Sequence, residues 1–383
     1  MKYYIIAGEA SGDLHASNLL KELKTKDIEA KFRAWGGDLM QQQGAQIVKH
    51  YRELAIMGFW EVLTNIGTVM NNLSFCKKDI VEYQPDVLIL VDYPGFNLRI
   101  AEFAHKQGIK VFYYISPKIW AWKKSRAKKI KKFVDKMFVI FPFEIDFYQK
   151  LGYPVEFVGN PAIDAIEQRK IKFPSKETFW KEHNLSEKPC IALLPGSRKQ
   201  EIERLLPVML NVIDFFPNFQ FLLAAAPSLP PSFYTQYIEN KNVKMIYDKT
   251  YETLNFSQAA IVASGTATLE TALLGIPQVV CYKMAEISFQ IIKLLVKISY
   301  VSLVNLLLNK LSVKEFIQHE CNVENLKTEL NSILFDKIYR TNMLKDYSEL
   351  KKILGGTGAS ERSAEIMFKN LANYQLPAKE MTE

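Results

Sequence analysis

Two short apolar strands in this chain each run directly into a glycine-containing turn that begins a helix. The first strand, Tyr3–Ala7, continues into Gly8-Glu9-Ala10-Ser11-Gly12-Asp13, and the second, Ile191–Leu194, continues into Pro195-Gly196-Ser197-Arg198. Such a turn directs unpaired backbone N–H groups and the positive end of a helix toward the edge of the sheet, where they favour a phosphate or carboxylate. Two such turns in separate halves of the chain predict two α/β domains that face one cleft.

Strand and helix patterns alternate along both halves of the chain, an order that predicts a parallel, doubly wound, Rossmann-like sheet in each. A polar stretch over 167–189 lacks strand signals and separates the two halves. We predict a first domain over 1–165, a second over 186–355, and a C-terminal helix and tail over 356–383 that packs on the first domain or is exchanged in a dimer. The expected strands are Tyr3–Ala7, Lys31–Trp35, Val87–Val91, Val111–Tyr114, Met137–Ile140, Val155–Val158, Ile191–Leu194, Phe219–Ala224, Lys244–Ile246, Ala259–Ala263 and Gln278–Cys281.

The composition is that of an ordinary folded protein. The chain has 383 residues, of which 48% are hydrophobic, and a formal net charge of +8, which is compatible with anionic partners. Its four cysteines lack the CxxC spacing of a zinc site and do not suggest a disulfide framework, so reduced thiols of a cytoplasmic protein are expected. The N-terminus reads as a strand rather than a signal peptide. The apolar stretch Ile287–Leu308 contains Lys293 and Lys297, so we expect partly buried helices there rather than a membrane span.

Polar residues follow the predicted strands of the first half, at the edge where open α/β sheets bind ligands. The turn Gly8–Asp13 offers close backbone approach, a hydroxyl and two carboxylates, although Ser11 and Asp13 could instead only cap the helix. Asp92 follows the very apolar run Val87–Val91, where a partly desolvated carboxylate can accept a proton from an incoming hydroxyl. Its alternative role is to bond loop N–H groups in the turn.

The corresponding residues of the second half suit a nucleoside diphosphate. Arg198, after Gly196 and Ser197, could stabilise a diphosphate leaving group, although an arginine here could also be a plain surface residue. Ser264, Gly265 and Thr266 begin another predicted helix, and Glu270 one turn later could accept both ribose hydroxyls. No cluster of metal-ligand residues appears in the sequence, so we expect metal-independent chemistry without a cofactor.

The chain contains six separated motifs: Gly8–Asp13, Glu53–Gly58, Asp92–Asn97, Ser116–Trp122, Leu193–Arg198 and Ser264–Ala267. Together they resemble the lipid-A-disaccharide synthase family of GT-B glycosyltransferases over nearly the whole chain. The resemblance implies two Rossmann-like domains, with Asp92 and Arg198 as the functionally important residues and an asparagine at Asn305 near the nucleotide; Val304 replaces a frequent proline. We predict substrate contacts by Gly8, Glu9, Ser11, Gly12, Asp13, Asn97 and Ser116, and UDP contacts by Gly196, Ser197, Arg198, Ser264, Gly265, Thr266, Glu270 and Asn305.

The resemblance also implies a reaction. The family joins UDP-2,3-diacylglucosamine to 2,3-diacylglucosamine 1-phosphate with inversion, forming a β(1→6) disaccharide and releasing UDP. Dimers with exchanged C-terminal segments are known in the family. A UDP-GlcNAc 2-epimerase or another GT-B transferase would share the fold and the nucleotide site, and a non-enzymatic nucleotide- or RNA-binding protein would explain the charge but give Asp92 no task.

Two segments suggest a membrane-surface partner. The predicted helix Phe59–Leu73 has apolar residues at helical spacing and only one charge, Glu61, whereas a soluble surface helix normally carries more. The run Lys118–Lys132 combines eight basic residues with Trp120 and Trp122, a mixture suited to anionic headgroups. The helix could instead belong to the core, and the basic run could be a solvated face or a nucleic-acid site. We predict peripheral attachment to the cytoplasmic surface of the inner membrane, with no nucleic-acid partner, through Phe59, Trp60, Val62, Leu63, Ile66, Val69, Leu73, Trp120 and Trp122.

Overall fold

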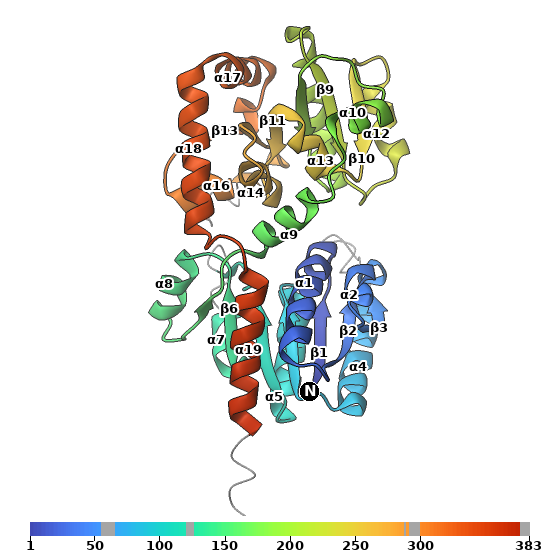
Figure 1. Cartoon of the computed structure of the whole chain (residues 1–383), viewed down its shortest axis with the longest axis vertical. Coiled ribbons are helices and arrows are strands. Elements are labelled where there is room, and N and C mark those ends of the chain that lie inside the picture. The colour runs from blue at the N-terminus through green and yellow to red at the C-terminus, as the bar shows by residue number, and fades with distance from the viewer. Residues whose placement is uncertain (55–65, 120–125, 287–288, 291–298, 376–383) are drawn as a thin grey trace, which may run out of the picture. The chain divides into compact units, whose positions relative to one another are not determined.

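The computed structural model describes residues 1–54, 66–119, 126–286, 289–290 and 299–375. These residues form two compact units, drawn in Figure 1. The first comprises Met1–Ala165 and the C-terminal segment from Leu354, and the second comprises Ile166–Ile353.

The first unit is built on a parallel seven-stranded sheet with the order β3-β2-β1-β4-β5-β6-β7. Its strands are β1 (Lys2–Ala7), β2 (Lys31–Gly36), β3 (Gln46–His50), β4 (Val87–Val91), β5 (Lys110–Tyr114), β6 (Lys136–Val139) and β7 (Glu156–Phe157). Its helices are α1 (Ala10–Lys26), α2 (Asp38–Gln42), α4 (Ile66–Tyr83), α5 (Pro94–Lys106), α7 (Arg126–Phe133), α8 (Phe143–Lys150) and α19 (Ala359–Gln375), with the 3₁₀ turn η1 (Tyr51–Glu53); α9 (Pro161–Lys170) leads into the second unit.

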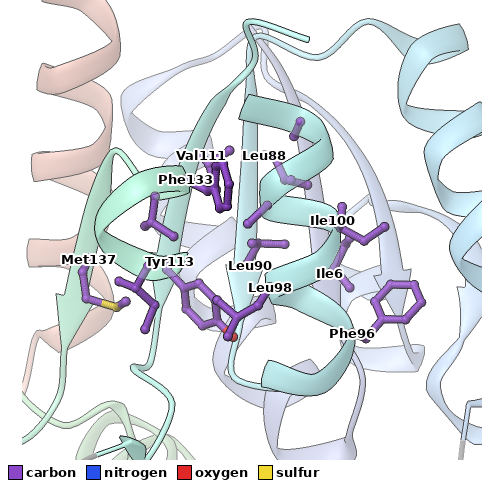
Figure 2. Close-up of a cluster of buried hydrophobic side chains, with 14 of the residues drawn as sticks. Ile6, Leu88, Leu90, Phe96, Leu98, Ile100, Val111, Tyr113, Phe133 and Met137 are labelled. Carbon is purple, nitrogen blue, oxygen red and sulfur yellow. The ribbon is translucent and has the colours of Figure 1, made fainter. Parts of the chain in front are cut away.

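Helices cover both faces of this sheet, because alternate residues of its strands point to opposite sides. On one face, Tyr3, Ile5 and Ala7 pack with buried residues of α1, α2 and α19. On the other, Tyr4 and Ile6 pack with α4, α5, α7 and α8. Figure 2 shows part of this second cluster, with Leu98 and Ile100 of α5 beside Leu88 and Leu90 of β4.

The second unit has a parallel six-stranded sheet with the order β10-β9-β8-β11-β12-β13. Its strands are β8 (Cys190–Leu194), β9 (Gln220–Ala225), β10 (Val243–Tyr247), β11 (Ser257–Ala263), β12 (Gln278–Tyr282) and β13 (Glu315–Ile317). Its helices are α10 (Lys176–Glu182), α11 (Lys199–Leu210), α12 (Pro231–Ile238), α13 (Thr250–Asn255), α14 (Thr266–Leu273), α16 (Leu303–Leu308), α17 (Val323–Phe335) and α18 (Lys337–Ile353), with the 3₁₀ turns η2 (Ile213–Phe215) and η3 (Gln318–Glu320).

The limits of the two units differ from the ranges expected of the domains. The second unit begins at Ile166 rather than at residue 186, and Phe179 and Trp180 of α10 pack against Cys190 and Leu222 of its sheet. The chain returns to the first unit at Leu354, whose carbonyl accepts a hydrogen bond from the Asn160 N–H. In that unit α19 lies along α1 (Figure 1) and contributes buried residues to the core.

Candidate active site

The first glycine turn and Asp92 lie at the same point of the first sheet. The strand order reverses between β1 and β4, which are neighbours, and a doubly wound sheet binds ligands beyond the carboxyl ends of such a pair. Gly8 follows β1 and Asp92 follows β4. A Cβ atom on Gly8 would lie 2.5 Å from the Tyr93 ring, so the two turns pack in direct contact and only glycine fits at this position.

The backbone at Asp92 is strained. Asp92 and Tyr93 have φ angles of 43° and 46°, a left-handed conformation that costs a non-glycine residue about 1–3 kcal/mol. The Asp92 carbonyl oxygen accepts hydrogen bonds from Asn97 Nδ2 at 2.8 Å and from the Tyr113 hydroxyl at 2.5 Å. These contacts hold a turn that the backbone would not adopt freely, as expected where the chain fixes the direction of a functional side chain.

The surroundings of the Asp92 carboxyl group favour its protonated form more than water does. Burial raises its pKa to about 6, and the negative charge of Glu9 acts in the same direction. The charge of Lys118 and the backbone N–H of Tyr93 lower the pKa by smaller amounts. A carboxylate with a pKa near the working pH is well matched to general-base catalysis.

Three residues of the first unit that are predicted to contact the substrate make hydrogen bonds within the protein. The Asp13 carboxylate accepts hydrogen bonds from the backbone N–H groups of Gly37, Leu39 and Met40 at 2.7–3.2 Å, so it caps α2 rather than α1. The Asn97 side chain is completely buried and donates to carbonyl groups at the ends of β1 and β4. The buried Ser116 hydroxyl lies 2.7 Å from the Tyr148 hydroxyl. These contacts give Asp13, Asn97 and Ser116 structural roles, and their predicted contacts with the substrate stay predictions.

Other residues of the first turn remain open to a ligand. Glu9 and Ser11 are exposed, and Glu9 is the N-cap residue of α1 without a capping side-chain bond. Gly12 lies against β1, where an added Cβ would be 3.2 Å from that of Ala7. Backbone N–H groups at this helix start, together with Ser11 and Glu9, can therefore meet an acceptor sugar.

The second glycine turn occupies the equivalent point of the second sheet, because β8 and β11 are neighbours at the reversal of strand order. Gly196 has a φ of 108°, and an added Cβ would lie 2.6 Å from the carboxylate of Glu201. Arg198 is the N-cap residue of α11, and its side chain is 77% exposed. Its nearest acidic partner is Glu201 at 3.8 Å, a loose pair that leaves the guanidinium available to an anion.

The turn after β11 is braced by its neighbours. The Ser264 hydroxyl donates to the Val301 carbonyl at 2.8 Å, and the Ser264 N–H donates to the Cys281 carbonyl. Gly265 and Thr266 are exposed at the start of α14. One turn later, Glu270 Oε1 accepts a hydrogen bond from the Tyr251 hydroxyl at 2.9 Å.

The Asn305 side chain makes hydrogen bonds within this region of the second unit. Its side chain is completely buried, and its amide nitrogen donates to the Val313 carbonyl and to Glu315 at 2.8 and 2.7 Å. Its amide oxygen accepts the N–H groups of Ser312 and Val313. All donors and the acceptor of the Asn305 side chain are therefore used, so in this conformation it has no free group for the predicted UDP contact. Val304 is also buried.

Three tyrosines belong to the site although sequence reasoning did not select them. Tyr93 packs against Gly8, Tyr113 bonds the Asp92 carbonyl, and Tyr251 bonds Glu270. Tyr93 is next to Asp92 in the sequence, but nothing in the sequence links Tyr113 or Tyr251 to its partner. Elsewhere in the described parts of the chain, no group of three or more His, Cys, Asp or Glu side chains could hold a metal ion.

The structure describes only some of the predicted membrane-docking residues. Phe59, Trp60, Val62, Leu63, Trp120 and Trp122 lie outside the described residues, and Ile66 begins α4. Leu73 is wrongly assigned to a membrane face, because it is only 5% exposed within the core of the first unit, and Val69 packs against the same core. No helix among the described residues is long and apolar enough to cross a membrane.

Comparison with known proteins identifies the family. The family model described as Lipid-A-disaccharide synthetase matches residues 3–368. The lipid-A-disaccharide synthase of Nitrosococcus oceani is 38% identical over 381 residues, covering 97% of both chains. That of Geobacter metallireducens is 36% identical over 373 residues, covering 96% of both.

Solved structures at low identity share the fold. A UDP-GlcNAc 2-epimerase from Neisseria meningitidis, solved with UDP-GlcNAc, has a TM-score of 0.70 at 14% identity and covers 97% of this chain and 100% of its own. The corresponding enzyme of Methanocaldococcus jannaschii has a TM-score of 0.65 at 15% identity, covering 96% and 100%. Both confirm the α/β, GT-B architecture predicted from the sequence. With the family match over nearly its whole length, the chain belongs to the lipid-A-disaccharide synthase family of UDP-sugar-dependent glycosyltransferases.

Proposed function

We propose that this lipid A disaccharide-forming glycosyltransferase transfers 2,3-diacylglucosamine from UDP to the 6-hydroxyl of 2,3-diacylglucosamine 1-phosphate. The products are UDP and a β(1→6)-linked disaccharide 1-phosphate, formed with inversion at the anomeric carbon. Family membership supports the class of reaction. The proposal of these substrates and of inversion rests on the family resemblance together with the chemistry of Asp92.

In this proposal Asp92 is the general base. It takes the proton of the acceptor hydroxyl while that oxygen attacks the anomeric carbon from the face opposite UDP. The carrying observation is the Asp92 carboxyl group itself: it follows a buried strand at the reversal point of the sheet, in a strained turn, with a pKa raised to about 6. Such a group is ionised at neutral pH and basic enough to accept a proton.

The second unit is proposed to bind UDP. Arg198 would neutralise the negative charge that grows on the departing diphosphate, and the N–H groups of the Gly196 and Gly265 turns would face its phosphates. Glu270 would accept the ribose hydroxyls. An arginine can supply the charge stabilisation that a metal ion supplies in other transferases, so we propose a mechanism without metal or cofactor.

Peripheral attachment to the cytoplasmic surface of the inner membrane would bring the enzyme to its acylated substrates. In the described part of the chain, Met70 and Val81 of α4 are 55% and 51% exposed. Lys77 lies on the same side of the helix, and α7 adds the exposed Lys128, Lys129, Lys131 and Lys132. Apolar and basic side chains together suit an anionic bilayer surface. We also propose a homodimer, on the resemblance alone.

The experiment that tests the proposal is the kinetics of Asp92→Asn, which keeps the shape of the side chain and removes its basicity. We expect kcat to fall by about 10²–10⁴-fold, the usual contribution of a general base, while UDP affinity changes little. Asp146→Asn is the matched control, because Asp146 is an exposed carboxylate on α8 of the same unit. Near-normal turnover of Asp92→Asn would reject the assignment.

A further inference from the structure

The hydrogen bond between Tyr251 and Glu270 joins two helices at the ligand-binding edge of the second sheet. Tyr251 lies on α13, which follows β10, and Glu270 lies on α14, which follows β11. The Tyr251 hydroxyl donates to Glu270 Oε1 at 2.9 Å, and both side chains are partly buried. The bond occupies one oxygen of the carboxylate and leaves Oε2 available.

We propose that Tyr251 is a positioning residue for Glu270, holding its carboxylate so that Oε2 is presented to the ribose hydroxyls of UDP. This inference rests on the proposed function of Glu270 and adds a residue to it. A carboxylate free to rotate would lose side-chain entropy on binding, whereas one already fixed by Tyr251 has lost it beforehand.

The same bond favours the form of Glu270 that can accept hydroxyl protons. A protonated carboxyl group donates one hydrogen bond and cannot accept two with full strength. Burial raises the pKa of Glu270, and the hydrogen bond from Tyr251 acts in the opposite direction. Tyr251 therefore keeps Glu270 ionised to lower pH than burial alone would allow.

Two other charged groups, Arg169 and Glu252, lie near the pair and contact each other, while Glu252 Oε2 is buried without a hydrogen-bond partner among the described residues. Glu252, next to Tyr251 on α13, accepts two hydrogen bonds from Arg169 through Oε1 at 3.1 and 3.2 Å. Arg169, Glu252 and Glu270 are the charged side chains that act on the Tyr251 hydroxyl, and burial together with the two carboxylates raises the pKa of Tyr251 far above its usual value. Tyr251 is thus a hydrogen-bond donor at every working pH.

The test compares UDP binding by calorimetry in the full-length protein and in Tyr251→Phe, Glu270→Gln and Tyr339→Phe. Tyr339→Phe is the matched control, because the Tyr339 hydroxyl donates to Glu329 at 2.6 Å in the same unit but on α17 and α18. The probes are UDP and 2′,3′-dideoxy-UDP, which lacks both ribose hydroxyls. Each is measured between pH 6 and pH 8.

We expect Tyr251→Phe to weaken UDP binding about tenfold, the size of one charge-assisted hydrogen bond, and more at pH 6 than at pH 8. It should bind dideoxy-UDP as the unmodified protein does, and Tyr339→Phe should leave both affinities unchanged. If Glu270→Gln weakens UDP binding clearly but Tyr251→Phe leaves it unchanged, the positioning role of Tyr251 is overturned, while the ribose contact of Glu270 stands. An equal loss for both ligands in Tyr251→Phe would also overturn it, since that result indicates general damage. Unchanged UDP binding in Glu270→Gln would overturn the ribose contact and this inference with it.

Discussion

At the scale of single residues, the surroundings of a carboxylate decide its role in this protein. Asp13 lies in α1, the helix after the central strand β1, and Asp92 directly follows the central strand β4. Three backbone N–H groups occupy the Asp13 carboxylate, so it works as a structural cap. Asp92 uses its backbone carbonyl for internal bonds, while burial and Glu9 make its carboxyl group more basic.

The raised pKa of Asp92 predicts a particular pH dependence. A general base acts only when ionised, so kcat/KM should be constant at neutral pH and fall as the pH drops through about 6. Because the charge of Glu9 contributes to the raised pKa, Glu9→Gln should move this break to lower pH. Rate measurements from pH 4.5 to 8 check both expectations. The absence of a break between pH 5 and 7, as expected of a carboxyl group with the ordinary pKa of about 4, or a break that Glu9→Gln leaves in place, would contradict them.

Arg198 should matter through its guanidinium geometry as well as its charge. Its loss should cost about 2–4 kcal/mol of transition-state stabilisation, and Arg198→Lys should also be impaired, because lysine lacks the fork that binds two phosphate oxygens. Lys199→Ala provides the control, since Lys199 is the next residue and also exposed. Steady-state kinetics of the three variants give the answer. Full activity of Arg198→Lys would show that a point charge is enough, and full activity of Arg198→Ala would remove Arg198 from the site.

The sequence predicts which residues lie at the ends of the central strands, but it does not predict which hydrogen bonds each of them makes. Asp92 and Arg198 are recognisable because they follow apolar strands and, for Arg198, a glycine turn. The commitment of Asp13 to Gly37, or of Asn305 to Glu315, depends on contacts between segments that only the folded chain brings together. The hydrogen bond from Tyr251 to Glu270 likewise joins two segments that only the folded chain brings together.

At the scale of elements, helix α4 carries apolar side chains both on the side that packs in the core and on the side that is exposed. Leu73, Cys76 and Ile80 are buried in the core, whereas Met70 and Val81 are exposed. Apolar spacing in the sequence identifies the amphipathic helix but does not state which side meets the sheet. The exposed side, with its lysines, is the described surface on which membrane attachment should depend.

The two sides of α4 should respond differently to substitution. Leu73→Ser should lower the free energy of unfolding by about 3 kcal/mol or more, since it leaves a cavity and buries a hydroxyl. The double variant Met70→Ser with Val81→Ser should change stability by less than about 1 kcal/mol yet sediment less with anionic phospholipid vesicles. Denaturant unfolding and vesicle sedimentation measure the two effects. Unchanged sedimentation of the double variant would remove this surface from the docking face.

The strands illustrate what an apolar pattern can and cannot show. Buried parallel strands such as β4, with the sequence VLILV, are continuous apolar runs and were predicted with the correct bounds. Two of the four edge strands, β3 (QIVKH) and β13 (EFI), are missed because their sequences are partly polar, whereas the edge strands β7 and β10 overlap predicted strands. An edge strand has a neighbour on one side only and meets solvent, so its sequence carries a weaker signal.

At the scale of the whole molecule, the two units share one type of fold, a doubly wound parallel sheet. Each unit has a parallel sheet whose strand order reverses between two central strands, and most of the predicted ligand residues follow those two strands; Ser116, after β5, and Asn305, on α16, do not. This doubly wound fold could be predicted from the alternation of strands and helices. For the C-terminal segment the sequence left two alternatives open, packing on the first domain or exchange in a dimer, and in the structure α19 packs against α1 of the first unit.

In the proposed reaction the protein makes a lipid A disaccharide from two acylated sugars. The most direct test is incubation of the purified protein, without added metal, with UDP-2,3-diacylglucosamine and 2,3-diacylglucosamine 1-phosphate, and in parallel with UDP-GlcNAc. Products are identified by mass spectrometry, and the new glycosidic bond by NMR. We predict equal amounts of UDP and a β-linked disaccharide 1-phosphate from the acylated pair, and no turnover of UDP-GlcNAc alone. An α-linked product, or epimerised UDP-GlcNAc with no disaccharide, would contradict this account.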